Sequence, residues 1–269
     1  MVAFPPVKIN LGLNIIAKRA DNFHDIESVF YPVGWTDVIE VIVTENQEFN
    51  LQMTGLPIPG DPSKNLIFKA YEILKNDYEI PGLSFHLHKI LPMGAGLGGG
   101  SSDGACALKL INEVAQLGIS SEKLHDYALQ LGSDCPFFLT EKAAFVKGRG
   151  EMLEPISIDL SGWHILITMP PVSISTAEAY SWITPHQPQK SIREIISLSP
   201  EDWKDQLKND FEIHAIQRHP IIGEIKSKMY EMGATYVSMS GSGASVYGLF
   251  KHKPQNFQTE GMQIWEGRL

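Results

Sequence analysis

The sequence predicts an α+β protein that mixes strands and helices and forms one large unit or two closely joined lobes. Three observations support this prediction. The chain has 269 residues, enough to bury a sizeable core. Along it, segments of alternating apolar and polar residues, typical of strands, are mixed with segments of helical spacing. A turn-prone run at 147–150 is followed by a new strand pattern, so we place the lobe boundary near Glu154, between residues 1–154 and 155–269.

The first lobe begins with a strand. From Val7 to Ile15 the apolar residues occupy one face and Lys8, Asn10, Gly12 and Asn14 the other, which predicts one dry face and one ordinary solvated face. The remaining elements expected in this lobe are strands at 28–32, 38–44, 48–53, 83–90 and 143–146, and helices at 65–75, 105–115 and 121–131.

The second lobe is expected to start with a strand at 164–169, which leads through Pro170 and Pro171 into a helix at 176–182. The stretch 184–190 is predicted to be a loop. Three helices are expected at 200–208, 209–218 and 220–232, and a pair of strands should flank residues 240–243.

A glycine-rich loop lies between the strand at 83–90 and the next helix, in the run Pro92-Met93-Gly94-Ala95-Gly96-Leu97-Gly98-Gly99-Gly100-Ser101-Ser102-Asp103. Glycines let the backbone turn with positive φ and approach an anion closely, and the start of the following helix offers unpaired N–H groups. The order strand, loop, helix therefore predicts a phosphate site. A glycine-rich surface turn without a ligand is the weaker alternative, because so many glycines lose much entropy on folding.

Two familiar phosphate motifs do not fit this loop. The glycines at 94, 96 and 99 match the letters of a dinucleotide fingerprint, but that fold needs a second strand where residues 121–131 repeat as a helix. A Walker loop needs a lysine after its last glycine, where this chain has Ser101.

Phosphoryl transfer requires held phosphates, neutralised charge and an aligned acceptor hydroxyl. Asp134 follows an apolar helix and precedes Pro136, a position from which a carboxylate can accept a hydroxyl proton or can simply cap its own turn. Lys8, with Asn10 on the same strand face, is a candidate cation, although the pattern of this strand taken alone favours an ordinary solvated face.

Other side chains suit recognition of a base. The turn 19–24 carries Phe23 and His24, which can stack on a base and bond its edge, or can belong to a plain surface loop. Gly241 and Gly243 can wrap an anion or form a tight turn between strands. His86 and His88 share a strand face without a completing ligand, so we interpret them as surface residues.

Composition excludes several classes of protein. A formal charge of −9 argues against a nucleic-acid or membrane-surface binder, both of which use basic faces. Cys106 and Cys135 have no metal spacing and fit a reducing cytoplasm. We expect an unexported cytoplasmic protein without a signal peptide or membrane span, present as a monomer or weak homodimer.

Taken together, five motifs resemble the GHMP kinase superfamily, and they lie at residues 6–11, 19–24, 92–103, 132–138 and 239–244. The resemblance implies an α+β fold with an S5-type α/β first lobe, a ferredoxin-like second lobe and the active site between them. It also implies ATP with Mg²⁺ as phosphate donor. The strand motif and the Phe23-His24 turn resemble members whose acceptor alcohol is linked to cytidine diphosphate.

The resemblance assigns roles to the candidate residues. Asp134 would be the general base, Lys8 its electrostatic partner, and Asn10 a substrate-positioning residue. Residues 92–102 would wrap the ATP phosphates, with Ser101 or Ser102 at the magnesium. The adenosine pocket would be lined by Asn65, Leu66 and Lys89, whereas Phe23, His24, Tyr180, Gly241 and Gly243 would contact the acceptor.

Three positions depart from the family pattern. Asn22 stands where glycine is usual, but asparagine tolerates the left-handed conformation. Phe23 replaces a frequent tyrosine and Gly104 a frequent alanine, and the latter is expected to loosen the helix start. A mevalonate-type or homoserine kinase would give Phe23 and His24 no role. A non-catalytic nucleotide sensor would not need both Asp134 and Lys8.

Overall fold

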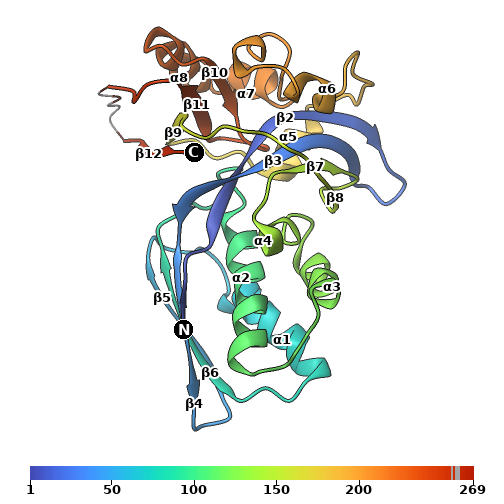
Figure 1. Cartoon of the computed structure of the whole chain (residues 1–269), viewed down its shortest axis with the longest axis vertical. Helices are drawn as coiled ribbons and strands as arrows, with labels where there is room; N and C mark the ends of the chain where they lie inside the picture. Colours follow the sequence, from blue (N-terminus) through green and yellow to red (C-terminus); the bar gives the residue numbers. More distant parts are fainter. Residues whose placement is uncertain (256, 258–260) are drawn as a thin grey trace. The chain divides into compact units, whose positions relative to one another are not determined.

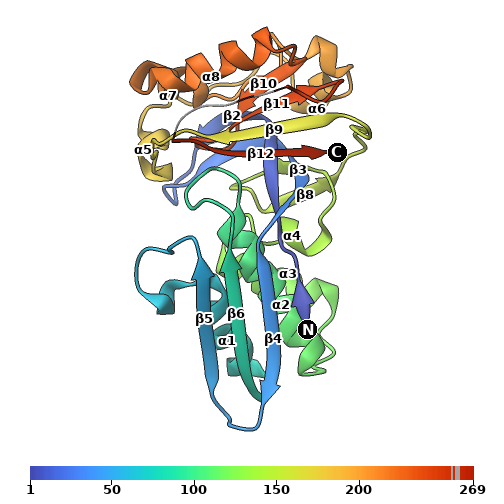
Figure 2. The ribbon, with the colours of Figure 1, turned by 90° about the vertical axis from the view of Figure 1, so that its left-hand side faces the viewer.

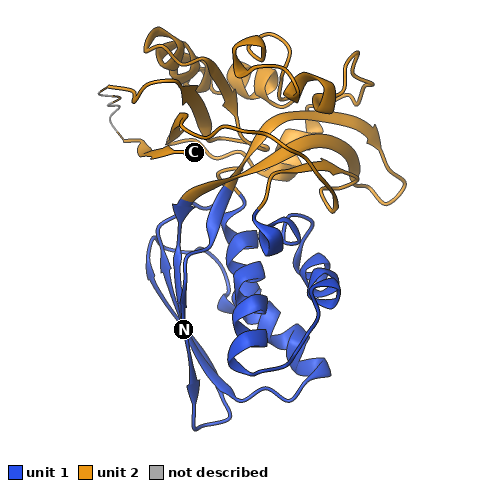
Figure 3. Ribbon diagram, in the orientation of Figure 1, with its two compact units in different colours: residues 1–7, 35–93, 98–141 blue, residues 8–34, 94–97, 142–269 orange. Residues whose placement is uncertain are grey.

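The computed structural model describes residues 1–255, 257 and 261–269. The chain folds into two compact units, and each unit is built from several segments of the chain (Figure 3). Unit 1 comprises residues 1–7, 35–93 and 98–141, and unit 2 comprises residues 8–34, 94–97 and 142–269. These units differ from the single division predicted at Glu154. The physical reason is that β2 (Pro6–Lys18), which lies beside β3 (His24–Thr36) and β7 (Ala144–Lys147) in one sheet, bonds to residues far beyond 154. The Leu13 N–H donates to the Lys208 carbonyl at 2.9 Å, and the Tyr247 hydroxyl donates to the Asn10 carbonyl at 2.7 Å.

Unit 1 contains a sheet in the order β1-β4-β6-β5, in which β5 and β6 are parallel and the other pairs antiparallel. Its strands are β1 (Val2–Ala3), β4 (Val38–Thr44), β5 (Phe49–Gly55) and β6 (Gly82–Lys89). The helices α1 (Leu66–Asp77), α2 (Gly99–Val114) and α3 (Ser121–Leu131) lie on one face of this sheet (Figures 1 and 2). The short elements η1 (Pro62–Lys64) and α4 (Phe137–Thr140) complete the unit.

Local sequence accounts for the helix starts in unit 1. The Asn65 side chain accepts a hydrogen bond from the Ile67 N–H at 2.9 Å and caps α1, and Ser120 caps α3 in the same way. A Cβ on Gly104 would lie 2.8 Å from the Leu66 Cβ. Gly104 thus allows α1 and α2 to approach closely, and the predicted loosening of the phosphate-binding turn at the helix start stays a prediction.

Unit 2 contains two sheets, in the orders β10-β11-β9-β12 and β2-β3-β7-β8. Their remaining strands are β2 (Pro6–Lys18), β8 (Met152–Pro155), β9 (His164–Met169), β10 (Tyr236–Met239), β11 (Val246–Phe250) and β12 (Gln263–Arg268). The first sheet is antiparallel and places β9 between β11 and β12, the expected ferredoxin-like arrangement. The helical elements are α5 (Thr176–Ser181), α6 (Ile192–Ile196), η2 (Pro200–Asp202), α7 (Glu212–Arg218) and α8 (Pro220–Glu231).

The helix predicted at 200–208 is wrong. Only the 3₁₀ turn η2 forms, after which Trp203 is buried and its indole N–H donates to the Leu198 carbonyl at 3.1 Å. The chain then runs beside β2, where the Leu13 N–H donates to the Lys208 carbonyl at 2.9 Å. These tertiary contacts override the local helical pattern, and for the same reason α7 begins only at Glu212.

The polar face of β2 is not solvated. Lys8, Asn10 and Asn14 are all buried, as are the apolar residues of the opposite face. Buried polar side chains need partners, so this face has a specific structural or chemical purpose. The interpretation of Lys8 and Asn10 as an ordinary solvated face is therefore wrong.

On β6, the side chains of His86 and His88 share one partner, the Thr54 hydroxyl, at 2.8 and 2.9 Å. Within residues 1–255, 257 and 261–269, no group of three or more His, Cys, Asp or Glu side chains is arranged to hold a metal ion. In the same part of the chain, no helix combines the length and apolar character needed to cross a membrane.

Candidate active site

The glycine-rich loop connects β6 to α2, as predicted. Gly94, Gly96 and Gly98 have φ angles of +64°, +74° and +73°, in the left-handed region that favours glycine. Helix α2 begins at Gly99, so the N–H groups of its first turn follow directly on the loop. Such N–H groups lack partners within their helix and, together with the helix dipole, attract anions.

The tip of this loop packs against the turn that follows β10. The Ser240 hydroxyl donates to the Gly96 carbonyl at 2.8 Å, and the Ser245 N–H donates to the Ala95 carbonyl at 3.2 Å. A Cβ on Gly96 would lie 2.1 Å from the Ser240 carbonyl oxygen, and one on Gly241 would lie 2.9 Å from that of Gly96. The structure thus brings together two glycine turns that the sequence had singled out separately.

This close approach gives a testable difference between two glycines. We expect Gly96→Ala to destabilise the protein by several kcal/mol, because it adds a clash with the Ser240 carbonyl to the cost of about 1–2 kcal/mol for a left-handed alanine. Gly94 has a similar φ, and apart from its chain neighbours no atom of the described residues lies within 4 Å of a Cβ added there, so Gly94→Ala incurs only the conformational cost. Urea unfolding of both variants measures the difference, and equal losses would contradict the close packing.

The two serines of the loop differ in their surroundings. Ser101 hydrogen-bonds the thiol of Cys135, which is buried and whose pKa burial raises to about 12, so it stays protonated. The Ser102 hydroxyl is buried and has no hydrogen-bond partner among the residues that the structure describes. A phosphate or Mg²⁺ fits this chemistry, because the loop offers N–H groups and an unpartnered hydroxyl, and Mg²⁺ sites commonly take several ligands from substrate phosphates and water.

Asp134 lies in the turn 132–136 that precedes α4, as predicted. The Cys135 N–H donates to the Gly132 carbonyl at 3.1 Å, and the Phe138 N–H donates to the Cys135 carbonyl at 3.1 Å. Because the Cys135 thiol also bonds Ser101, the turn of Asp134 is held beside the first turn of α2. Asp134 belongs to unit 1 and Lys8 to unit 2, and their partnership stays a prediction.

Lys8 and Asn10 are joined on the buried face of β2. The Lys8 ammonium donates to the Asn10 side-chain oxygen and lies 4.5 Å from the centre of the Phe30 ring. The Asn10 amide nitrogen donates to Ser28 at 2.8 Å, and the Tyr247 hydroxyl donates to the Asn10 carbonyl at 2.7 Å. In this arrangement Asn10 orients the lysine.

The candidate base-binding residues lie together in unit 2. Asn22 has a φ of 66°, which confirms that asparagine supports the left-handed turn. The rings of His24 and Tyr180 stack at 4.6 Å, so His24 covers one face of Tyr180, and a base that stacks on that face must displace the imidazole. Sequence reasoning missed Arg149, whose guanidinium lies 4.7 Å from the centre of the Phe23 ring.

A buried ionic cluster beside the loop was also missed. Lys89 is 1% exposed, and its ammonium donates to Asp37 at 2.5 Å and Asp103 at 2.6 Å. Burial raises the pKa of Asp103 to about 7, although Lys89 opposes the rise. The lysine predicted to line an adenosine pocket thus has its ammonium engaged by two carboxylates. Asn65 caps α1. The role of Asn65 and Leu66 in lining an adenosine pocket stays a prediction.

Comparison with known proteins identifies the family. The model for the GHMP kinases N terminal domain matches residues 65–142, and that for GHMP kinases C terminal matches residues 188–260. A protein of Bacteroides thetaiotaomicron called 4-diphosphocytidyl-2-C-methyl-D-erythritol kinase is 47% identical over 100% of both chains. A protein of the same name from Parabacteroides distasonis is 44% identical over 100% of both chains.

Solved structures agree. A crystal structure of 4-(cytidine 5'-diphospho)-2C-methyl-D-erythritol kinase superposes with a TM-score of 0.80 at 28% identity, over 93% of this chain and 90% of that chain. The mevalonate kinase of Methanococcus jannaschii shares the fold, with a TM-score of 0.69 at 14% identity over 100% and 98% of the two chains. The two-lobed kinase fold expected from the sequence is confirmed, and the chain belongs to the 4-diphosphocytidyl-2-C-methyl-D-erythritol kinases of the GHMP superfamily.

Proposed function

We propose that this kinase transfers a phosphate from ATP to the 2-hydroxyl of 4-diphosphocytidyl-2-C-methyl-D-erythritol, giving the 2-phosphate and ADP, a step in the non-mevalonate route to isoprenoid precursors. The observation that carries this proposal is identity of 44–47% over the whole length of relatives with that name. The mevalonate kinase neighbour, at 14% identity, supports only the shared fold.

In this proposal the chain's own residues position and deprotonate the acceptor. Asp134 accepts the proton of the 2-hydroxyl, and Lys8, oriented by Asn10, stabilises the negative charge that develops on that oxygen. The N–H groups of the loop and of the first turn of α2 hold the phosphates. Mg²⁺, which Ser101 or Ser102 would help to hold, neutralises phosphate charge when bound.

The product tests this proposal directly. After incubation with ATP, Mg²⁺ and the cytidine substrate, phosphorus NMR should show a new phosphomonoester bonded to the oxygen at C2 of the substrate. The diphosphate should remain intact. A phosphate at another hydroxyl would contradict the proposed acceptor, and release of inorganic phosphate alone would indicate ATP hydrolysis without transfer.

His24 is expected to select the cytosine ring. Burial, with a smaller effect of Lys18, lowers the pKa of His24, so its imidazole is neutral at pH 7 and offers one donor and one acceptor. We expect His24→Ala to raise KM for the cytidine substrate by about 10-fold to 100-fold, which corresponds to about 1.4–2.8 kcal/mol. KM for ATP should stay unchanged.

The control for this prediction is His86→Ala on β6, whose ring bonds Thr54 in unit 1. It should leave both KM values at the wild-type level. Because the pKa of His24 is lowered, KM of the wild-type enzyme for the cytidine substrate should stay flat down to about pH 6.5 and rise only at more acidic pH. Equal effects of the two substitutions would refute a specific role for His24.

A further inference from the structure

The segment 208–212, here called the brace segment, joins β2 to the turn after β10 within unit 2. Its backbone pairs with β2, because the Leu13 N–H donates to the Lys208 carbonyl and the Asp210 N–H donates to the Leu13 carbonyl, both at 2.9 Å. The Asp210 carboxylate also accepts from the Ile15 N–H at 2.7 Å. These bonds fix the brace segment to the strand that carries Lys8 and Asn10.

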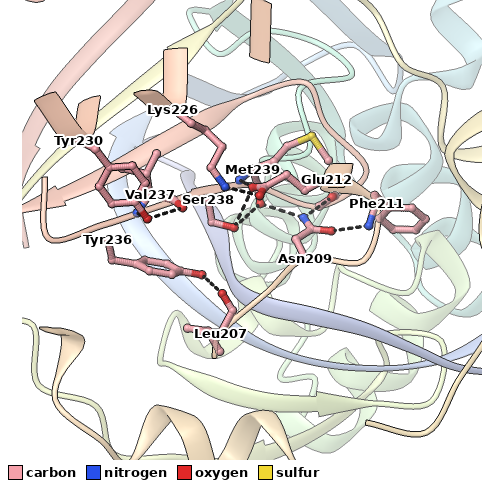
Figure 4. A network of polar contacts seen from close by, with 11 residues as sticks. Leu207, Asn209, Phe211, Glu212, Lys226, Tyr230, Tyr236, Val237, Ser238 and Met239 are labelled. Atoms are coloured by element: carbon pink, nitrogen blue, oxygen red, sulfur yellow. Dashed lines mark hydrogen bonds and ion pairs between the residues drawn. The ribbon is translucent and has the colours of Figure 1, made fainter. Parts of the chain in front are cut away.

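Asn209 uses its side-chain amide nitrogen to hold the turn after β10 (Figure 4). It is 4% exposed, and its amide nitrogen donates to the carbonyls of Met239 at 2.8 Å and Gly241 at 2.9 Å. Its side-chain oxygen accepts from the Phe211 N–H at 3.0 Å. The two donated bonds reach the residues on either side of Ser240, so Asn209 sets the conformation of the turn at that serine.

Glu212, the last residue of the brace segment, holds the same end of β10 (Figure 4). Its carboxylate accepts from the Met239 N–H at 2.7 Å and forms an ion pair with Lys226. The end of β10 is therefore bonded through its N–H to Glu212 and through its carbonyl to Asn209. Such a doubly bonded strand end has little freedom to move.

Ser240, which lies between these anchored residues, contacts the glycine-rich loop between β6 and α2, here called the phosphate loop. The Ser240 hydroxyl accepts from the Asn10 N–H at 3.3 Å and donates to the Gly96 carbonyl at 2.8 Å. Because glycine has no side chain to pack, the conformation of Gly96 depends on such neighbours. A continuous chain of bonds thus runs from Asn209 through the turn at Ser240 to Gly96.

We propose that Asn209 is a positioning residue for ATP: it holds the turn 240–243 where that turn supports the tip of the phosphate loop. Asn209 touches no reacting group, and its role rests on the proposed function of the loop. Among side chains of this size only asparagine offers two donors on one atom beside an acceptor. Aspartate would turn a carboxylate toward two carbonyl oxygens, which repel it.

The test measures ATP affinity by calorimetry, without any acceptor, for Asn209→Asp and Asn209→Ser. We expect the Kd for ATP to rise about tenfold or more in Asn209→Asp and by a smaller factor in Asn209→Ser, which keeps one donor. If Asn209→Asp does not fold, Asn209→Ser decides. An unchanged Kd for ATP in a folded variant would overturn the proposal.

Two further variants separate positioning from general stability. Asn112 makes a comparable pair of bonds to the backbone of Ile119, at 3.2 and 2.9 Å, between α2 and α3. Asn112→Asp should lower the unfolding midpoint and leave the Kd for ATP unchanged. Ser240→Ala should raise that Kd and show non-additivity with Asn209→Ser, because both act through one link. Additive effects, or the same rise in Asn112→Asp, would contradict the proposal.

The readout also separates this proposal from the proposed function. An enzyme that binds ATP but does not phosphorylate the cytidine substrate would contradict the function, and the Asn209 variants would still report on ATP affinity. Turnover of the substrate with an unchanged Kd in the variants would overturn only the role of Asn209.

Discussion

Asp134→Asn is expected to lower kcat with the cytidine substrate by about 10²-fold to 10⁴-fold, the usual contribution of a general base, while the Kd for ATP stays near the wild-type value. Asparagine keeps the size of the side chain but cannot accept the hydroxyl proton. The turn itself should persist, because it is held by backbone bonds and by the contact between Cys135 and Ser101.

The matched control is Asp126→Asn, on the exposed side of α3 in the same unit. It removes the same charge from the protein and should leave kcat and the Kd for ATP unchanged. Near-normal turnover of Asp134→Asn, measured as ADP release, would show that another group accepts the proton.

Lys89→Met should have the largest effect on stability, a loss of about 3–5 kcal/mol, because it leaves the Asp37 and Asp103 carboxylates buried without their cation. Asp37 would keep its bonds from the N–H groups of Ile90 and Leu91, at 2.6 and 2.8 Å. Among the described residues, no backbone N–H supports Asp103 in this way, and its second oxygen already lacks a partner there. Chemical denaturation measures the loss.

Lys109→Met is the control, because Lys109 pairs with Glu141 at a site where its side chain is 36% exposed. An exposed pair contributes at most about 1 kcal/mol, so this variant should remain close to wild type. Adding Asp103→Asn to Lys89→Met should restore part of the loss. Equal losses for the two lysines would mean that the buried cluster contributes no more than a surface pair.

The pH dependence of stability provides a check on the same cluster. The pKa of Asp103 is raised from 3.8 to about 7, so between these values the folded protein holds a proton that the unfolded chain has released. Its contribution to stability is therefore complete below pH 3.8 and is lost as the pH rises through about 7. Asp103→Asn should remove this decline, and an unchanged profile between pH 5 and 8 would contradict it.

Local patterns were sufficient to predict much of the fold. The strands at 38–44 and 164–169 and the helix at 121–131 have the predicted bounds, because alternation and helical spacing are read within one segment. The helix predicted at 200–208 failed where burial of Trp203 and pairing with β2 decided the conformation. The division into two units built from several segments each could not be predicted either, because it depends on which distant segments of the chain pair.

In the candidate site, too, local motifs could be predicted from the sequence and long-range contacts could not. The glycine loop and the turn of Asp134 are continuous motifs and could be located from sequence. The burial of Asn10 depends on Ser240 and Tyr247, more than two hundred residues away, and no local spacing indicates such partners. The cluster of Asp37, Lys89 and Asp103 likewise joins three separate parts of the chain. Roles that depend on long-range contacts therefore required the structure.

The most direct test of the proposed function is ADP release with Mg²⁺ and ATP, comparing 4-diphosphocytidyl-2-C-methyl-D-erythritol with mevalonate, homoserine and galactose. We expect turnover with the cytidine substrate alone, and its loss in Asp134→Asn. Turnover with mevalonate or homoserine, or ATP binding without turnover of any acceptor, would contradict the proposed function.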